Sequence, residues 1–289
     1  MRFDEAYSGN VFIAAQATYE EADVVIFGMP MDFTVSYRPG SRFGPKRIRE
    51  VSIGLEEYSP YFDRELGELK YFDALDIPLP FGNPQKSVEL IAGFVKKLLD
   101  DHKFPLGLGG EHLVSWPIIQ EVYKKYPDMV LFHFDAHADL RIDYEGETYS
   151  HATPIRKAVE LIGGKNVYQF GIRSGTKEEF YFGRKNTNFY PFQVLEPLTE
   201  VLQEIGNRPV YVTIDIDVFD PAYAPGTGTL EAGGIGPQEM LLAIRKLANS
   251  SLKVIGADIV EVAPIYDSAD QTSILAAKLV RELMLGFIK

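Results

Sequence analysis

Histidine and aspartate residues gather in two short segments of the chain, at a spacing that suits a metal site. Four of the 5 histidines fall between positions 112 and 151. Asp135, His137 and Asp139 alternate with alanines, and a single residue separates Asp215 from Asp217. Where a chain stays extended, side chains two positions apart project to the same side. Each segment can therefore point its acidic and imidazole groups at one centre.

Carboxylates packed at the end of an apolar strand repel one another and lose solvation unless a cation neutralises them. Mixed carboxylate and imidazole ligands suit Mn, Fe or Mg, with Zn or Co as further options. A shared carboxylate can bridge two ions about 3.5–4 Å apart, and such a pair makes hydroxide from water near neutral pH. One Asp-x-Asp pair alone would more often be solvated loop acids or helix caps, but two such pairs favour a metal cluster.

A glycine-rich turn at residues 107–112, Gly-Leu-Gly-Gly-Glu-His, follows one expected strand. A phosphate-binding turn is one interpretation. The segment lacks the third glycine of a dinucleotide fingerprint and the Lys-Ser/Thr of a P-loop. The favoured interpretation is that the glycines let the backbone pass close to a site while His112 points into it.

The elements that must position these residues alternate along the whole chain, as short apolar runs and amphipathic stretches. This pattern is typical of strand and crossover-helix units on a parallel sheet, covered by helices on both faces. The expected strands are Val24–Phe27, Pro105–Leu108, Met129–Asp135, Val167–Ile172, Pro209–Asp215 and Val254–Val260.

Three amphipathic stretches are expected to be helices. Ser87 could cap the first, in which Leu90, Ile91, Phe94, Val95, Leu98 and Leu99 recur at helical spacing. Pro237 could open the second, and the third runs from Thr272 to Ile288. The segments Met29–Pro45 and Pro221–Pro237, rich in Gly and Pro, are expected as long loops at the carboxyl edge of the sheet, where ligands of open α/β sheets bind. Without an internal repeat or a Ser/Gly-rich linker, one domain spanning 1–289 is predicted.

Charge and composition narrow the function classes. The 289 residues include 29 Lys+Arg and 41 Asp+Glu, a formal net charge of −12, which argues against binding to nucleic acid or to a membrane surface. Cysteine is absent, which excludes a disulfide scaffold, a thiolate zinc site and a cysteine nucleophile. The N-terminus has no signal-peptide pattern, and no apolar run approaches the roughly 20 residues of a membrane helix. An intracellular, cytoplasmic protein is expected.

Seven motifs, in order and spacing, resemble the ureohydrolases, the family of arginases and agmatinases, and most closely the bacterial agmatinases. They are Arg-Pro-Gly-Ser-Arg-Phe-Gly-Pro at 38–45, Gly-Gly-Glu-His at 109–112, Asp-Ala-His-Ala-Asp at 135–139, Ser-His-Ala-Thr-Pro at 150–154, Thr-Ile-Asp-Ile-Asp-Val-Phe-Asp-Pro at 213–221, Ala-Pro-Gly-Thr-Gly-Thr at 224–229 and Asp-Ile-Val-Glu-Val-Ala-Pro at 258–264. The family more often has glycine after the histidine at 151, where Ala152 stands here.

The resemblance implies a three-layer αβα fold with a central, mainly parallel sheet, and two manganese ions per subunit. By motif position, one ion would be held by His112, Asp135, Asp139 and Asp215. The other would be held by His137, Asp135, Asp215 and Asp217. Asp220 matches no ligand position and is expected to fix its turn as an Asx cap. The resemblance also implies a homo-oligomer, a trimer or a hexamer.

Three residues match catalytic positions of the family. Glu261 would orient the planar guanidinium of the substrate, because a carboxylate matches its fork of donors. A metal-bridging hydroxide would attack the central carbon, and Asp139 would give a proton to the departing amine. His151, near the mouth of the site, would exchange protons with solvent. His133, two residues before Asp135, is interpreted as a hydrogen-bonded core histidine.

The substrate is expected to be agmatine, cleaved to putrescine and urea in polyamine biosynthesis. The loop after Asp139 carries Asp143, Glu145 and Glu147, which suit a substrate that ends in an ammonium group. The alternatives are 4-guanidinobutyrate, arginine and N-aminopropyl-agmatine. A substrate with a carboxylate would need a cationic anchor, such as Arg141 or Arg38. Rivals from other classes are a catalytically silent scaffold subunit and a nucleotide-dependent enzyme.

Overall fold

One parallel sheet of eight strands organises residues 11–288, the part of the chain that the computed structural model describes. The strands follow one another in space in the order β4-β1-β5-β10-β9-β6-β7-β8, and every neighbouring pair is parallel. Their bounds are β1 Val24–Met29, β4 Tyr71–Asp76, β5 Phe104–Gly109, β6 Val130–Phe134, β7 Val167–Phe170, β8 Asn188–Tyr190, β9 Pro209–Asp215 and β10 Lys253–Val260. A short antiparallel pair, β2 Tyr58–Ser59 and β3 Arg64–Glu65, lies outside this sheet.

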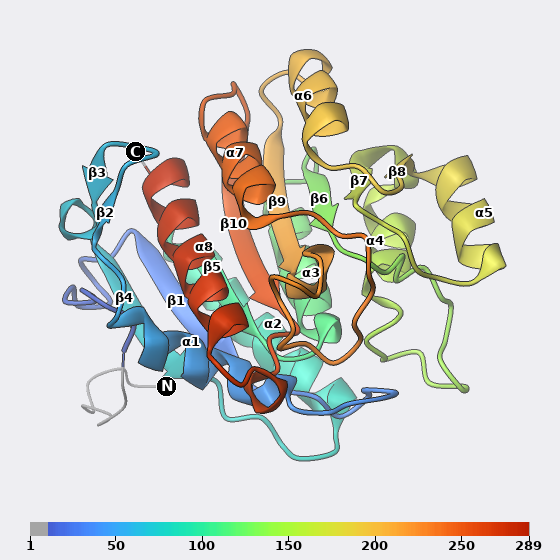
Figure 1. The fold of residues 1–289 in the computed structure, drawn as a ribbon, viewed down its shortest axis with the longest axis horizontal. Helices are drawn as coiled ribbons and strands as arrows, with labels where there is room; N and C mark the ends of the chain where they lie inside the picture. Colours follow the sequence, from blue (N-terminus) through green and yellow to red (C-terminus); the bar gives the residue numbers. More distant parts are fainter. Residues whose placement is uncertain (1–10, 289) are drawn as a thin grey trace.

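Helices cover both faces of the sheet and make three layers (Figure 1). One face carries α1 Gly44–Ser52, α6 Leu195–Glu204, α7 Pro237–Ala248 and α8 Gln271–Phe287. The other carries α2 Pro84–Asp100, α3 Ser115–Lys125 and α4 Pro154–Ile162. The short helix α5 Lys177–Asn186 lies beside β8 at the sheet's edge (Figure 1). The predicted αβα architecture is confirmed.

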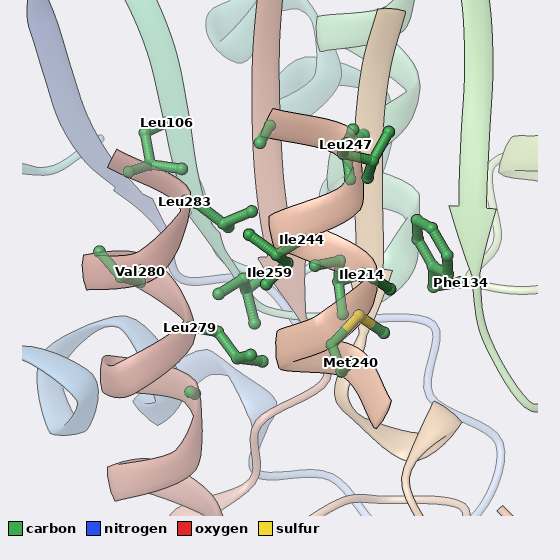
Figure 2. Packing of buried hydrophobic residues seen from close by; sticks show 14 of the residues in the cluster. Leu106, Phe134, Ile214, Met240, Ile244, Leu247, Ile259, Leu279, Val280 and Leu283 are labelled. Carbon is green, nitrogen blue, oxygen red and sulfur yellow. The ribbon is translucent and has the colours of Figure 1, made fainter. Parts of the chain in front are cut away.

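The alternation of side chains along the strands gives each helical layer its own core. In β6, Phe132 and Phe134 join the cluster under α7 and α8, whereas Leu131 joins the cluster on the opposite face. Figure 2 shows the first cluster at close range, with the helical and strand side chains interleaved. Its fully or almost fully buried members include Leu106, Ile214, Met240, Ile244, Ile259, Leu279 and Leu283. Burial of each such side chain contributes roughly 1.5–3 kcal/mol to the stability of the fold, so this core holds the strand ends in place.

The sequence predicted six of the eight sheet strands to within two residues at either end. It missed β4, in which aspartates interrupt the apolar pattern, and β8, which has only three residues. The prediction that Ser87 caps a helix is wrong. Helix α2 begins at Pro84, and the Asn83 side chain accepts a hydrogen bond from Lys86 N at 3.0 Å. Leu90, assigned to the apolar stripe of this helix, is exposed.

Two long connections lie where β1 and β9 end, as predicted, and both reach the same edge of the sheet. Ser36 of the first and Thr227 and Thr229 of the second line one cavity. Arg38 joins the two loops, because its guanidinium donates to the carbonyl oxygens of Thr227 and Gly228 at 3.0 and 3.1 Å. Among residues 11–288, no helix is long and apolar enough to cross a membrane.

Candidate metal centre

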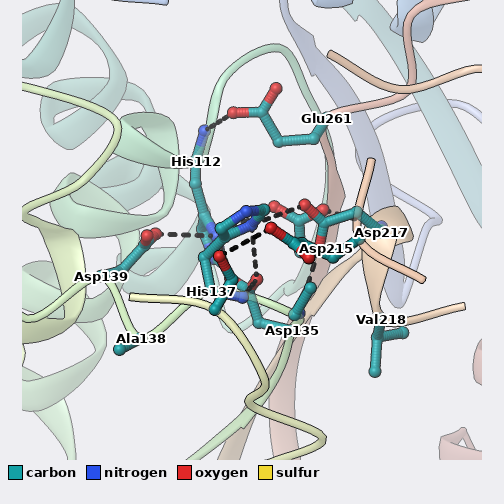
Figure 3. A network of polar contacts seen from close by, with 12 residues as sticks. His112, Asp135, His137, Ala138, Asp139, Asp215, Asp217, Val218 and Glu261 are labelled. Atoms are coloured by element: carbon teal, nitrogen blue, oxygen red, sulfur yellow. Dashed lines mark hydrogen bonds and ion pairs between the residues drawn. The ribbon is translucent and has the colours of Figure 1, made fainter. Parts of the chain in front are cut away.

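Four adjacent strands deliver the predicted site residues to one place at the carboxyl edge of the sheet. Asp215 is the last residue of β9, and Glu261 directly follows β10. Residues 135–139 follow β6, and His112 begins the short turn of helix after β5. Because β5, β10, β9 and β6 are consecutive in the sheet, these side chains converge, as Figure 3 shows.

His112 forms the centre of a first group of carboxylates. Its Nδ1 atom lies 3.0 Å from Asp135 Oδ2, 3.2 Å from Asp139 Oδ2 and 3.3 Å from Asp215 Oδ2. All four side chains are buried. These are the four residues that the sequence assigned to one ion, and the structure brings them together.

His137 forms a second group that shares Asp135 with the first. Its Nδ1 atom lies 2.8 Å from Asp217 Oδ2 and 3.6 Å from Asp135 Oδ1. Backbone N–H groups also fix three carboxylates of the cluster. His137 N donates to Asp135, Ala136 N donates to Asp217, and Asp217 N donates to Asp215. The two segments of the sequence are thereby joined into one cluster.

A hydrogen bond to the ring of His112 determines which of its two nitrogens carries the proton and which carries the lone pair. Thr213 Oγ1 donates its proton to Asp258 Oδ1 at 2.6 Å, so it can only accept from His112 Nε2, at 3.0 Å. In the neutral ring Nδ1 then carries the lone pair, yet it faces three carboxylates and has no hydrogen-bond partner. A ring nitrogen surrounded by anions needs a positive charge at that point, either a proton or a metal ion, so the arrangement fits a metal ligand.

The pKa shifts of the cluster also indicate that it needs positive charge. Burial and the charge of Asp135 raise the pKa of Asp139 well above its ordinary range, and burial together with Asp217 does the same for Asp215. Against the effect of burial, the neighbouring carboxylates hold the pKa of His112 well above its usual value. Without a metal, the cluster compensates its excess negative charge with protons. A divalent cation bound by carboxylates and imidazoles can replace those protons.

A cavity of about 310 Å³ opens above the cluster. His112, His137, Asp139, Asp215 and Asp217 form part of its wall, whereas Asp135 lies beneath it. The remaining lining residues include Ser36, Arg141, Tyr144, His151, Ala152, Ser174, Thr176, Glu179, Thr227, Thr229 and Glu261. The cavity therefore joins most of the predicted metal ligands to His151 and Glu261.

His151 is held at the cavity wall by its neighbours rather than by the cluster. Its backbone N–H donates to Thr34 Oγ1 at 2.9 Å, and its Nε2 lies 3.4 Å from Ser36 Oγ. Its ring packs 5.4 Å from that of Tyr144. Burial lowers the pKa of His151 to about 4. The imidazole is therefore neutral at pH 7.

Glu261 contacts the backbone of His112, whereas the aspartates surround its ring. Its own backbone is left-handed, with φ of 63°. Its backbone N–H donates to Gly110 O at 2.8 Å, and its Oε1 accepts from His112 N at 2.9 Å. Burial and the nearby Glu111 raise the pKa of Glu261 to about 8. A buried carboxylate beside another one favours a cationic neighbour, which suits a guanidinium.

The three acids of the loop after Asp139 do not line this cavity. Asp143, Glu145 and Glu147 are exposed, and the last two line a neighbouring groove. The interpretation that they face the substrate within the cavity is not supported by their positions. Arg141 does line the cavity, with its Nε 3.4 Å from Glu179 Oε2.

Two other sequence interpretations have clear outcomes. Asp220 accepts from Ala222 N at 3.0 Å and from Gly233 N at 2.8 Å, which confirms its role as a turn cap. No motif of the sequence singles out Thr34, Tyr144 or Glu179. Thr34 and Glu179 reach the site from distant segments of the chain, whereas Tyr144 lies in the loop between Arg141 and His151. Thr34 and Ser36 do fall in the loop that was expected to border a ligand site.

Comparisons with known proteins agree with this geometry. The Arginase family matches residues 22–286. The agmatinase of Bacillus subtilis (strain 168) is 64% identical over 290 residues, and that of Bacillus cereus is 67% identical, with complete coverage of both chains in each case. The crystal structure of the agmatine ureohydrolase of Thermoplasma volcanium superposes with a TM-score of 0.88 at 33% identity, and it covers 97% of this chain and 95% of that one.

Proposed function

The chain belongs to the arginase family, and from that membership we propose that it hydrolyses agmatine to putrescine and urea. The observation that carries this proposal is the identity of 64% and 67%, over complete lengths, with two agmatinases. At the level of chemistry, the cavity supports it by joining a cluster that needs cations to a buried carboxylate, Glu261, that suits a guanidinium.

We propose that the cluster holds two manganese ions. His112, Asp135, Asp139 and Asp215 would hold one, and His137, Asp217, Asp135 and Asp215 the other. When bound, the ions supply acidified water as the nucleophile and neutralise the carboxylates. The lone pair of His112 Nδ1, aimed at three carboxylates, supports this assignment most directly.

The protein's own residues would bind and orient the substrate. The guanidinium of agmatine is planar and stays protonated, and its N–H groups form a fork that matches Glu261. The bond between Glu261 Oε1 and His112 N fixes that carboxylate relative to the cluster. Attack by water requires that a guanidinium held by Glu261 present its carbon to the cluster.

Proton transfers complete the reaction. Water adds to the guanidinium carbon, and the bond from that carbon to the alkyl nitrogen then breaks. Both protons of the water end on the departing nitrogen, which leaves as an ammonium group of putrescine. The departing nitrogen takes a proton, which we assign to Asp139 in the cavity wall. We assign exchange with solvent to His151, whose neutral ring lies at the mouth beside Ser36 and Tyr144. The products are urea and putrescine, so atoms and charge balance.

We also propose that residues 1–289 act as one catalytic domain and that the chain forms a homo-oligomer, a trimer or a hexamer. The family match over residues 22–286 supports the first part. Light scattering coupled to size-exclusion chromatography measures the oligomeric state. A single-chain mass would contradict it.

A second substrate, 4-guanidinobutyrate, is favoured by one observation, the cationic Arg141 in the cavity wall. Its carboxylate could pair with that guanidinium in place of Glu179. Urea release by the manganese-loaded chain, measured with agmatine, arginine, 4-guanidinobutyrate and N-aminopropyl-agmatine, separates these cases. We expect agmatine to have the highest kcat/KM. A preference for a substrate with a carboxylate would overturn the agmatine assignment, and no urea from any substrate would overturn the function.

A further inference from the structure

A buried histidine that is absent from the proposed ligand sets lies directly against the cluster. His133 is fully buried in β6, two positions before Asp135 and on the same side of the strand. Its Nε2 lies 2.7 Å from Asp135 Oδ2. His133 also falls, with His112, Asp135 and Asp139, within one group of atoms close enough to hold an ion. It could therefore be a further ligand or a hydrogen-bond partner of one.

The side chain of Gln169, in the neighbouring strand β7, decides between these roles. One of its two terminal atoms lies 2.9 Å from the carbonyl oxygen of Ala138, which can only accept a hydrogen bond. That atom is therefore the amide nitrogen. The amide oxygen lies 3.1 Å from Thr187 Oγ1, whose single proton is shared with the carbonyl oxygen of Gly183 at 3.0 Å. The same nitrogen lies 3.2 Å from His133 Nδ1 and donates its second proton there.

This donation fixes the tautomer of His133. A ring nitrogen that accepts from an amide carries no proton, so the proton of the neutral ring is on Nε2. Nε2 then donates to Asp135 Oδ2. Both ring nitrogens are occupied, and no lone pair remains for a metal ion.

We propose that His133 is a positioning residue, which Gln169 holds in the Nε2–H tautomer so that it orients the metal-binding carboxylate of Asp135. The other oxygen of that carboxylate accepts from His137 N at 2.5 Å. One donor on each oxygen fixes the plane of the carboxylate, whose oxygens lie 3.0 Å from His112 Nδ1 and 3.6 Å from His137 Nδ1. Such outer partners typically change metal affinity by about 10–100-fold when removed.

Gln169 contributes in a second way, because its bond to Ala138 O holds the backbone between His137 and Asp139. Gln169 and His133 thus form one buried path of hydrogen bonds that ends at Asp135. The inference rests on the proposed metal centre, and its test uses metal binding rather than turnover.

The test compares His133→Phe, which removes the donor, with His133→Gln, whose amide nitrogen occupies nearly the position of Nε2. Free Mn²⁺ is followed by its electron paramagnetic resonance signal as each full-length protein is titrated. We expect His133→Phe to bind two ions about 10–100-fold more weakly, and His133→Gln to bind close to the unaltered protein. Thermal unfolding of the metal-free proteins checks that each variant folds.

Several outcomes would overturn the proposal. If His133→Phe binds manganese as tightly as the unaltered chain, the histidine does not position Asp135. If it binds one ion instead of two at saturation, His133 is a ligand. If His133→Gln loses as much affinity as His133→Phe, ring packing rather than the hydrogen bond is responsible. If the unaltered chain binds no manganese, the metal centre and this inference fail together.

A double-mutant cycle with Gln169→Leu tests the path itself. The exchange of glutamine for leucine removes both amide donors and keeps the side chain's size close to the original. If Gln169 acts partly through His133, the loss of manganese affinity caused by Gln169→Leu is smaller when position 133 is already phenylalanine. Strictly additive losses would contradict the path.

Discussion

The hydroxyl of Thr34 connects the end of β5 to the mouth of the cavity, and its removal makes a quantitative prediction. The hydroxyl donates to Glu111 Oε1 at 2.9 Å and accepts from His151 N at 2.9 Å. The backbone N–H of Thr34 also donates to Glu111 Oε2 at 2.8 Å. Glu111 is fully buried beside His112, so this chain of bonds ties the proposed proton-exchange residue to the base of the site.

Thr34→Val keeps the branched shape and removes only the hydroxyl. A hydrogen bond to a charged group contributes about 1.5–3 kcal/mol and a neutral one about 1 kcal/mol. Since Thr34 is half-buried, water replaces part of these bonds, and we expect a loss of about 2 kcal/mol in the free energy of unfolding. An unfolding entropy of about 2.1 cal/mol/K per residue, over 289 residues, converts this into a fall of roughly 3 °C in Tm.

The effect on catalysis follows from the second bond. Without its acceptor, the backbone of His151 is no longer fixed, and about 1 kcal/mol of lost positioning lowers kcat for agmatine roughly fivefold. Manganese affinity is expected to stay unchanged, because the bonds of Thr34 go to Glu111 and His151 and to none of the proposed ligands. The assays are thermal unfolding, steady-state urea release and manganese titration.

Thr34→Ser is the matched control, since it keeps the hydroxyl and loses one methyl group. It is expected to retain most of both kcat and Tm. If serine lowers kcat as much as valine does, the methyl group and not the hydrogen bonds is responsible. An unchanged kcat in Thr34→Val would refute the argument that this chain of bonds positions His151.

Three further predictions concern residues of the cavity wall. Glu261→Gln should lower kcat/KM for agmatine by about 10–100-fold, because a charge-assisted pair that contributes about 1.5–3 kcal/mol is lost. The amide oxygen of the glutamine still accepts from His112 N. Retention of full kcat/KM would contradict the proposed role of Glu261. Burial lowers the pKa of His151 from 6.5 to about 4, so between these values the unfolded chain binds a proton that the folded chain does not, and the metal-free protein should lose up to about 3 kcal/mol of stability as pH falls from 6.5 to 4. Chemical unfolding at a series of pH values should show a smaller loss in His151→Phe, and an identical pH dependence would count against the buried, neutral state. Arg141→Ala should leave kcat/KM for agmatine near its original value and reduce it for 4-guanidinobutyrate, because only the latter has a carboxylate to pair with this guanidinium; a large loss with agmatine would assign Arg141 another role.

The cluster of histidines and aspartates could be predicted from the sequence because its spacing survives folding almost unchanged. Asp135, His137 and Asp139 lie at the end of one strand, and Asp215 at the end of another. In a parallel sheet all carboxyl ends lie on one edge, so the convergence at His112 follows once the strands are adjacent. The strands themselves were recognisable because most are apolar throughout, as strands buried on both faces must be.

Features that depend on the packing of distant segments could not be predicted. The exposed loop acids Asp143 and Glu145 do not line the cavity, and a loop has no periodicity from which the side-chain direction could be predicted. The sequence placed His133 on the same side as Asp135, but its tautomer depends on Gln169, 36 residues further along the chain. The N-cap of α2 was misplaced because Asn83 and Ser87 are both capping residue types, and only the bond from Lys86 N distinguishes them.

The most direct test of the central claim is the product balance of agmatine hydrolysis as manganese is removed and restored. We predict one urea and one putrescine for each agmatine consumed, complete loss of activity after chelation, and recovery in proportion to the manganese bound. Asp135→Asn should remain inactive at every manganese concentration, since Asp135 belongs to both groups of the cluster. Urea formation that persists after the metal is removed, or that survives in Asp135→Asn, would contradict the account.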